Sequence, residues 1–216
     1  MDDHTPFNRA IWITTLALGV TIALGGFHHG VFEALQGNGP TGGIAINSIG
    51  PEHVRWEYGT DPAITLIPNF LFTGVAAMAV SLVIVGWSAL GLHRRRGPAL
   101  FLALFVLLTL VGGGVGHILF FVAAWAYATR MRSSLGWWRR RLRGRARSLL
   151  GRLWAPVLTL SSICFVLALE LSVFGYPPAR AKPDLVLAVD WSLLLACFAL
   201  LNLAYLGAIA RDLEPA

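Results

Sequence analysis

The stretch PALFLALFVLLTLVGGGVGHILFFVAAWAYAT, residues 98–129, contains no charged side chain and is long enough to cross a lipid bilayer. About 20 apolar residues suffice for one helical span, because a helix rises about 1.5 Å per residue through a hydrocarbon core of about 30 Å. Four glycines between Val111 and His117 divide the stretch into two arms. The topology of the protein depends on whether this stretch is one long helix or turns back on itself.

Four further apolar stretches lie at about residues 10–36, 63–92, 153–175 and 185–209. Hydrophobic residues make up 56% of the 216 residues, and charged residues make up 13%, whereas soluble domains carry about 25% charged residues. A bilayer core offers the backbone no hydrogen-bond partner, and no alternating strand pattern occurs, so each stretch is predicted to be helical. The sequence therefore predicts an all-α, polytopic membrane protein with a single transmembrane domain over residues 1–216.

The basic residues distinguish two topologies, because Lys and Arg favour the cytoplasmic side of a membrane. If residues 98–129 form one span, the protein has about five spans and places eleven basic residues on one side and six on the other. If the same residues form a re-entrant hairpin beside four spans, fourteen basic residues lie on one side of the membrane and three on the other. Gly112 and Gly116 also form the small-residue pattern by which single spans pack closely. We predict five spans and keep the hairpin as the alternative.

Seven arginines lie in the stretch WWRRRLRGRARSLLGRLW, residues 137–154. Apolar residues at helical spacing between them are typical of an amphipathic helix within residues 135–152 that lies among anionic lipid headgroups. The alternative is a simple cytoplasmic anchor, and Gly144 and Gly151 weaken a helix here. Basic charge that adjoins a span, instead of covering a soluble surface, does not indicate nucleic-acid binding. We expect residues 130–152 to be cytoplasmic in a multi-pass protein of the cell membrane. The residues predicted at the membrane surface are Arg139, Arg140, Arg141, Arg143, Arg145 and Arg147.

The connection of residues 38–62 between the first two stretches is rich in Gly and Pro and mildly acidic, and it contains Trp56 and Tyr58. A connection of this length without an element of its own is either functional or a flexible linker. Its apolar and aromatic content favours an ordered lid over the helices.

Ionisable residues within apolar spans are unfavourable and commonly mark function. His29 and Glu33 are four residues apart, so they lie on one face of the first helix. A carboxylate at this spacing stabilises an imidazolium or orients a neutral imidazole. We predict His29, Glu33 and Glu170 as the catalytic residues of a proton-transfer site. The other polar candidates within or beside the spans are His28, Asn69, His117, Asp190 and Asn202.

A metal or haem site is a separate hypothesis. His29, Glu33 and His117 together offer one carboxylate and two imidazoles, a set that suits zinc or iron, and two histidines are also able to hold a haem. The sequence contains no HExxH pattern and no series of histidine boxes. We therefore assign no metal ligand and leave the cofactor open.

The segment Gly26-Phe-His-His-Gly-Val-Phe-Glu33 resembles the first-span signature of the emopamil-binding (EXPERA) family, small helical membrane proteins that include sterol isomerases. In that family a histidine and a glutamate four residues apart line a cavity for an amphiphilic, often cationic, lipid-like ligand. His29 and Glu33 match these positions, and Glu170 is a candidate for the acidic residue of a later span. The resemblance covers eight residues, and the family's closely spaced late Asn and Trp have no counterpart. It implies ligand binding more directly than isomerisation.

Three functions are compatible with these patterns. The first is an intramembrane site that binds a lipid-like or small hydrophobic ligand and transfers a proton through His29. The second is a proton-coupled transporter or channel for a small solute, since chains of His, Glu and Asp carry protons through helical bundles. The third is a structural or accessory subunit whose polar groups hold helices together. We expect the first function, and assembly into an oligomer is compatible with all three.

Overall fold

The computed structural model describes residues 6–175 and 182–214. Within these residues, four helices are long and apolar enough to cross a membrane: α1 (Arg9–Leu35), α2 (Phe70–Leu90), α6 (Gly144–Phe174) and α7 (Pro183–Asp212). Three shorter helices lie between α2 and α6: α3 (Gly97–Leu110), α4 (Ile118–Ala128) and α5 (Gly136–Arg141). The connection from α1 to α2 contains strand β1 (Ala45–Asn47), the short 3-10 helix η1 (Pro51–His53) and strand β2 (Pro62–Ile64). The prediction of an all-α, polytopic membrane protein is confirmed.

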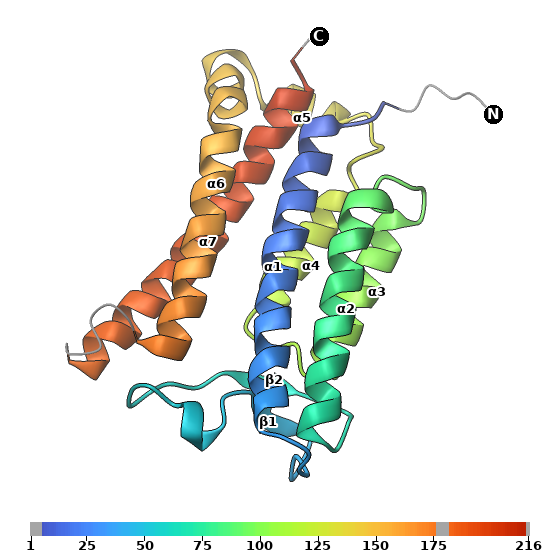
Figure 1. Ribbon diagram of the computed structural model, residues 1–216. Helices are drawn as coiled ribbons and strands as arrows, with labels where there is room; N and C mark the ends of the chain where they lie inside the picture. The colour runs from blue at the N-terminus through green and yellow to red at the C-terminus, as the bar shows by residue number, and fades with distance from the viewer. Residues whose placement is uncertain (1–5, 176–181, 215–216) are drawn as a thin grey trace.

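Residues 98–129 do not form a single span. α3 and α4 have 14 and 11 residues, so neither reaches across a hydrocarbon core of about 30 Å. The chain reverses between them, and both outer ends of the pair lie at the same end of the bundle (Figure 1). There Arg132 donates two hydrogen bonds to the carbonyl oxygen of His93, at 3.2 and 2.8 Å. The prediction of five spans is therefore wrong, and the alternative of four long helices beside a helical hairpin is correct.

The reversal between α3 and α4 is held by backbone pairing with the loop. Val111 forms an antiparallel bridge with Thr65, and the amide of Gly112 donates to the carbonyl oxygen of Ile64 at 2.9 Å. Gly112 and Gly114 have φ values of +99° and +89°, a region that residues with a side chain rarely adopt. These glycines permit a turn, whereas on the sequence alone they are also compatible with close packing of an unbroken helix.

α1 and α2 pack as an antiparallel pair along a seam of small residues. A Cβ added to Gly30 would lie 2.6 Å from the carbonyl oxygen of Gly74, and one added to Gly19 would lie 2.6 Å from Ser88 Oγ. The two backbones therefore approach more closely than larger side chains would allow. Such close packing stabilises helix pairs in lipid, where apolar burial between helices gives little net driving force.

α6 and α7 form a second antiparallel pair, and hydrogen bonds join it to α1 near the chain termini. Asp212, at the end of α7, accepts hydrogen bonds from the amides of Ala10 at 2.8 Å and Ile11 at 3.0 Å. These contacts cap the first turn of α1, whose amides have no partner within the helix. The buried hydroxyl of Tyr205 also donates to Thr15 Oγ1 at 3.0 Å. Toward the loop the α6–α7 pair diverges from α1 (Figure 1).

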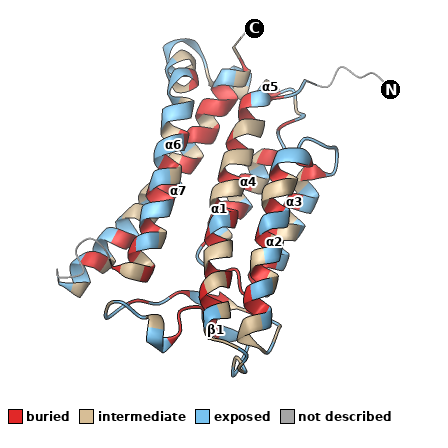
Figure 2. Cartoon of the chain, in the orientation of Figure 1, coloured by how far each residue is buried: buried red, intermediate tan, exposed pale blue. Residues whose placement is uncertain are grey.

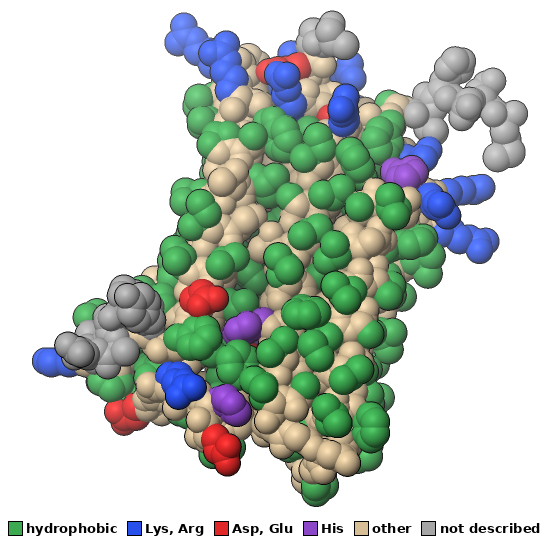
Figure 3. Space-filling view, in the orientation of Figure 1, with side chains coloured by type: hydrophobic (Ala, Val, Ile, Leu, Met, Phe, Trp, Pro, Cys, Tyr) green, Lys and Arg blue, Asp and Glu red, His purple; other side chains and the backbone are tan. Residues whose placement is uncertain are grey.

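The basic segment of residues 135–152, for which an amphipathic helix was predicted, does not form one continuous helix. α5 ends at Arg141, Gly144 has a φ of +55°, and the following residues form the first turns of α6. The helix is interrupted before Gly144, and the chain beyond it continues without a break into the apolar span. The place of this segment among lipid headgroups stays a prediction. Fourteen of the 17 Lys and Arg residues belong to the segments at this end of the bundle, and Figure 3 shows Lys and Arg side chains there on the face in view.

The outer surface of the bundle is apolar. Side chains that face the neighbouring helices are buried, while those on the outer faces are exposed (Figure 2). Large apolar residues are among the exposed ones, such as Leu82 on α2 and Leu195 on α7, which are 62% and 70% exposed. An apolar surface of this extent indicates contact with lipid.

Candidate functional site

A continuous chain of hydrogen-bonding side chains lies where α1 meets the loop. His29 Nε2 is 3.0 Å from Asp61 Oδ1, and His29 Nδ1 is 3.1 Å from Ser48 Oγ. Ser48 Oγ donates to Glu33 Oε1 at 2.9 Å. All four residues are buried, and Ser48 and Glu33 have no exposed surface. The predicted partners His29 and Glu33 are thus joined through Ser48.

The local structure explains how these four residues meet. His29 and Glu33 share a face of α1 because they are four residues apart. Ser48 follows β1 and Asp61 precedes β2, and the antiparallel pairing of the two strands places them side by side. The amide of Ser48 donates to the carbonyl oxygen of Asp61 at 2.8 Å. In addition, the amide of Asp61 donates to Asn47 Oδ1 at 2.8 Å. The strand pair therefore brings one hydroxyl and one carboxylate to the histidine.

The hydrogen-bond pattern indicates where the protons lie. His29 Nε2 and Asp61 Oδ1 are 3.0 Å apart, so a proton lies between the ring nitrogen and the carboxylate oxygen. His29 Nδ1 is paired with the Ser48 hydroxyl, and the tautomer of the ring sets which of the two donates. The proton shared between His29 and Asp61 lies at the wall of a cavity.

The glycine turn of the α3–α4 hairpin packs directly against these side chains. A Cβ added to Gly112 would collide with the Glu33 carboxylate, and one added to Gly114 would collide with the His29 ring. Among the described residues, Glu33 Oε2 has no hydrogen-bond partner. The turn thus encloses the inner end of the hydrogen-bonded chain with bare backbone.

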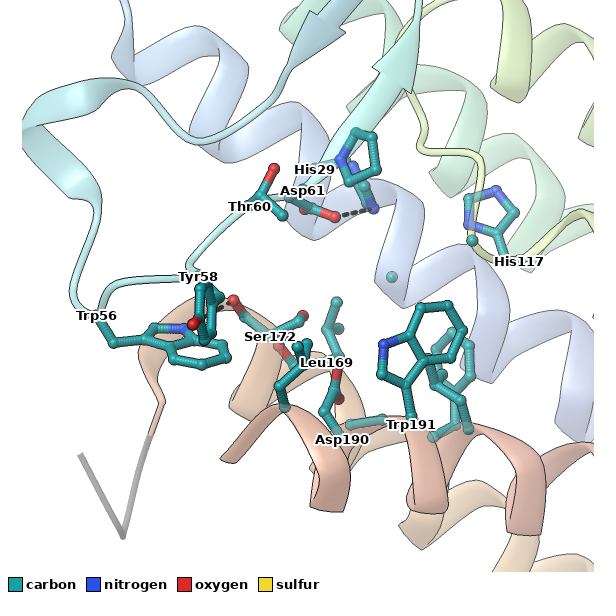
Figure 4. A pocket seen from close by; sticks show the side chains of 17 residues that line it. His29, Trp56, Tyr58, Thr60, Asp61, His117, Leu169, Ser172, Asp190 and Trp191 are labelled. Atoms are coloured by element: carbon teal, nitrogen blue, oxygen red, sulfur yellow. Dashed lines mark hydrogen bonds and ion pairs between the residues drawn. The ribbon is translucent and has the colours of Figure 1, made fainter. Parts of the chain in front are cut away.

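A cavity of about 250 Å³ lies beside His29 and Asp61, between α1, the loop, α6 and α7 (Figure 4). Three polar atoms of residues on its wall are buried and have no hydrogen-bond partner within the described residues: Asp61 Oδ2, His117 Nε2 and Asp190 Oδ1. Buried polar atoms are nearly always hydrogen-bonded. No Lys or Arg of the described chain lines the cavity. The rest of the wall is mostly apolar and includes Trp56, Tyr58, Phe165, Leu169, Leu187, Trp191 and Leu194.

The loop of residues 38–62 covers this cavity and contacts both helices of the α6–α7 pair. Trp56 Nε1 donates to the carbonyl oxygen of Ser172 at 3.1 Å, and the Trp56 ring packs against Gly175, which has a φ of +61°. The hydroxyl of Tyr58 donates to the Asp184 carboxylate at 3.1 Å, and this hydrogen bond raises the pKa of Tyr58 above its ordinary value. These contacts with α6 and α7 make the loop a wall of the cavity.

The structure brings together some of the predicted site residues. His29, His117 and Asp190 line the cavity, and Glu33 lies behind His29. His117 belongs to this group because the hairpin reverses immediately before it, which places its ring centroid 6.1 Å from that of His29. Asp190 joins the group because the first turns of α7 face the loop.

Other predicted residues lie apart from this group. Glu170 is exposed on α6 and does not line the cavity. His28 packs edge-on against Phe32, with ring centroids 4.8 Å apart. Asn69 caps α2 by accepting from the amide of Phe72. Asn202 donates to a backbone carbonyl of its own helix. The last two side chains have local structural roles.

Ser48 and Asp61 were not predicted as site residues, because both lie in the connection of residues 38–62, outside the apolar stretches that contain the predicted candidates. Asp61 stands before a proline in the loop, a position that on sequence alone indicates a turn. The acidic and aromatic character of the loop was the available signal. It predicted a lid but not which of its residues contact His29.

The described residues contain no group of three or more His, Cys, Asp or Glu side chains arranged to hold a metal ion. Of the three ligands considered from the sequence, His29 and His117 face one another, but Glu33 lies on the far side of Ser48. His29 and Glu33 are instead parts of the hydrogen-bonded chain through Ser48, which does not include His117.

No protein-family model, characterised protein or solved structure matches this chain. The resemblance of residues 26–33 to the EXPERA signature stays a prediction. The function is therefore inferred from the geometry of the site.

Proposed function

We propose that this integral membrane protein binds a lipid-like or small hydrophobic ligand in the cavity beside His29, and that His29 exchanges a proton with the ligand. The observation that carries the proposal is the set of three buried polar atoms without partners, on Asp61, His117 and Asp190, at the wall of an otherwise apolar cavity. Cavities of this composition, apolar with a few converging polar groups, are typical of small-molecule sites.

The charges at the wall favour a particular ligand head. The cavity presents two carboxylates, from Asp61 and Asp190, and no Lys or Arg of the described chain. A head group that donates hydrogen bonds, such as a hydroxyl or an amine, satisfies these oxygens, whereas a carboxylate is repelled. The aromatic faces of Trp56 and Trp191 are suited to an apolar body and to a nearby cation. Trp191 is 60% exposed on the outer surface of α7, so the cavity wall reaches the lipid-facing side.

The hydrogen-bonded chain supports proton transfer. An imidazole changes its charge near neutral pH and therefore both accepts and donates protons. In the proposed step the proton shared by His29 and Asp61 moves to the ligand, or a ligand proton moves to that pair. Ser48 and Glu33 do not line the cavity. They are positioning residues that hold the Nδ1 side of the ring.

Proton-coupled transport, the second function considered, needs ionisable groups along a path through the bundle. Between the cavity and the basic end, the described helices contain no His, Asp, Glu, Lys or Arg. The ionisable groups are instead gathered around one cavity, an arrangement that supports a binding site. Because Lys and Arg favour the cytoplasmic side, we place the basic end with residues 130–152 in the cytoplasm of a cell-membrane protein, and the cavity near the opposite surface.

The proposal is tested by binding octylamine, octanol and octanoate to the purified protein in detergent, measured as a shift in melting temperature. Octylamine and octanol are expected to stabilise the protein, and octanoate is not. The Asp190→Asn variant should bind octylamine about tenfold more weakly, because a charge-assisted hydrogen bond is lost. Ser192→Ala, at an exposed position of the same helix, is the control and should leave binding unchanged. Equal binding of octanoate, or unchanged octylamine binding by Asp190→Asn, would refute the proposal.

A further inference from the structure

The basic end of the bundle has few acidic partners of its own. Arg211 forms an ion pair with Glu214 at 2.7 Å, and Asp212 is engaged in capping α1. No other arginine of the described chain has a carboxylate within ion-pair distance. The guanidinium groups at this end are therefore available to anions from outside the described chain.

A cleft of about 620 Å³ lies at this end, where the chain passes from α4 to α5. Its polar side chains are Arg130, Ser133 and Ser134, and its aromatic side chains are Tyr127, Trp137 and Trp138. No acidic residue of the described chain lines it. The cleft thus combines a guanidinium and two hydroxyls with aromatic walls.

The cleft is located at the boundary between the apolar and the basic surface of the molecule. Leu119 and Val122 are exposed apolar residues of α4, 68% and 42% exposed, and α4 leads to the cleft. The guanidinium of Arg141 lies 5.1 Å from the ring centroid of Trp137, and Arg139 and Arg140 are exposed beside it. Tryptophan and tyrosine prefer the level of the lipid headgroups. The cleft therefore lies where a headgroup would be.

The backbone at the cleft is held in an unusual conformation. Leu135 has a φ of +50° and is the one described non-glycine residue with a positive φ. This conformation is unfavourable for a leucine and persists only where surrounding contacts enforce it; such residues are more frequent at functional sites. Leu135 is 5% exposed, and α5 begins at the next residue. Its conformation directs the Trp137–Trp138 pair, whose ring centroids are 4.6 Å apart, to the cleft wall.

We propose that this cleft binds the phosphate of an anionic glycerophospholipid from the membrane leaflet around the basic end. The Arg130 guanidinium and the Ser134 hydroxyl donate hydrogen bonds to the phosphate oxygens, because a planar guanidinium pairs well with phosphate. The Ser133 hydroxyl donates to the carbonyl oxygen of Arg130 at 3.0 Å. The aromatic walls cover the glycerol and the first methylene groups. A lipid, and not a free phosphate, is the favoured occupant because the cleft adjoins the lipid-facing surface of α4. This inference is independent of the proposed cavity function.

The test is a titration of the purified protein in neutral detergent with dioleoyl phosphatidylglycerol or dioleoyl phosphatidylcholine, followed by native mass spectrometry. Phosphatidylglycerol should bind about tenfold more tightly, and Arg130→Gln should remove about tenfold of its affinity. Arg145→Gln is the matched control, because it removes the same charge from an exposed position outside the cleft. It is expected to change the affinity less than twofold.

Three outcomes would overturn the proposal. Equal binding of the two lipids would show no headgroup recognition. Equal losses in Arg130→Gln and Arg145→Gln would show a diffuse surface charge in place of a site. Displacement of phosphatidylglycerol by glycerol phosphate at similar concentration would show a site for free phosphate. If Arg130→Gln does not fold, Trp137→Ala provides a second variant. Weaker binding of phosphatidylglycerol by Trp137→Ala supports the proposal, and unchanged binding refutes it.

Discussion

Ser48, His29 and Asp61 have the composition of a hydrolytic triad, and their burial argues for a different role. In a triad the serine oxygen must reach the substrate, but Ser48 has no exposed surface and does not line the cavity. Its hydroxyl proton is directed to Glu33 at 2.9 Å. Ser48 therefore connects the two predicted residues His29 and Glu33 and orients the imidazole. Asp61 and His29, in contrast, line the cavity.

Replacing Ser48 with alanine tests this connecting role. The substitution leaves Glu33 Oε1 and His29 Nδ1 buried without a partner, so the free energy of unfolding should fall by about 1–3 kcal/mol. The measurement is equilibrium unfolding in detergent, with Ser192→Ala as the control, for which a change below about 0.5 kcal/mol is expected. Equal stability of the two variants would contradict the assigned role of Ser48.

The α3–α4 hairpin shows how one element determines the shape of the site. Its glycine turn pairs with β2 on one side and packs against the Glu33 carboxylate and the His29 ring on the other. A continuous helix through the same residues would place His117 on a helix surface and separate Val111 from Thr65. The glycines of the turn therefore matter in two ways. They adopt a backbone conformation with positive φ, and they leave room for the side chains of Glu33 and His29.

Two glycine substitutions separate these effects. Gly114→Ala introduces a methyl group into the His29 ring at a φ of +89°, and we expect a loss of about 2–4 kcal/mol in unfolding free energy. Gly116→Ala is the matched control two residues away, because a Cβ there meets no atom within 4 Å. Its unfolding free energy should change by less than about 1 kcal/mol. Similar destabilisation by both substitutions would indicate that the turn does not pack on His29 as described.

The bundle combines four long helices with the α3–α4 hairpin, whose two outer ends lie at the same end of the bundle (Figure 1). As a result, the start of α1, both outer ends of the hairpin and the end of α7 lie together (Figure 1). This arrangement places the basic residues around 94–96 on the same side as the arginines of α5 and α6, whereas a five-span topology would separate them. The cavity and the loop then lie at the opposite end.

Cysteine labelling tests this topology in cells. Arg95→Cys, Arg140→Cys and Glu57→Cys each place a thiol at an exposed position, while the native Cys164 and Cys197 are buried. A membrane-impermeant maleimide should label Glu57→Cys in intact cells and should label the other two only after permeabilisation. Labelling of Arg95→Cys and Arg140→Cys from opposite sides would restore the five-span topology and refute the hairpin.

Some properties of this protein follow from local sequence alone, because transfer of side chains into lipid depends mainly on the residues of each segment. The apolar stretches, their helical state and the shared face of His29 and Glu33 are of this kind, and so is the charge count that kept the hairpin as an alternative. The course of residues 98–129 does not follow from local sequence, because GGGVG permits both a kinked span and a turn. Only the pairing with residues 62–66, which are far away in the chain, selects the turn. Asp61 and Ser48 reach His29 for the same reason: strand pairing and helix packing bring together residues that no local spacing relates.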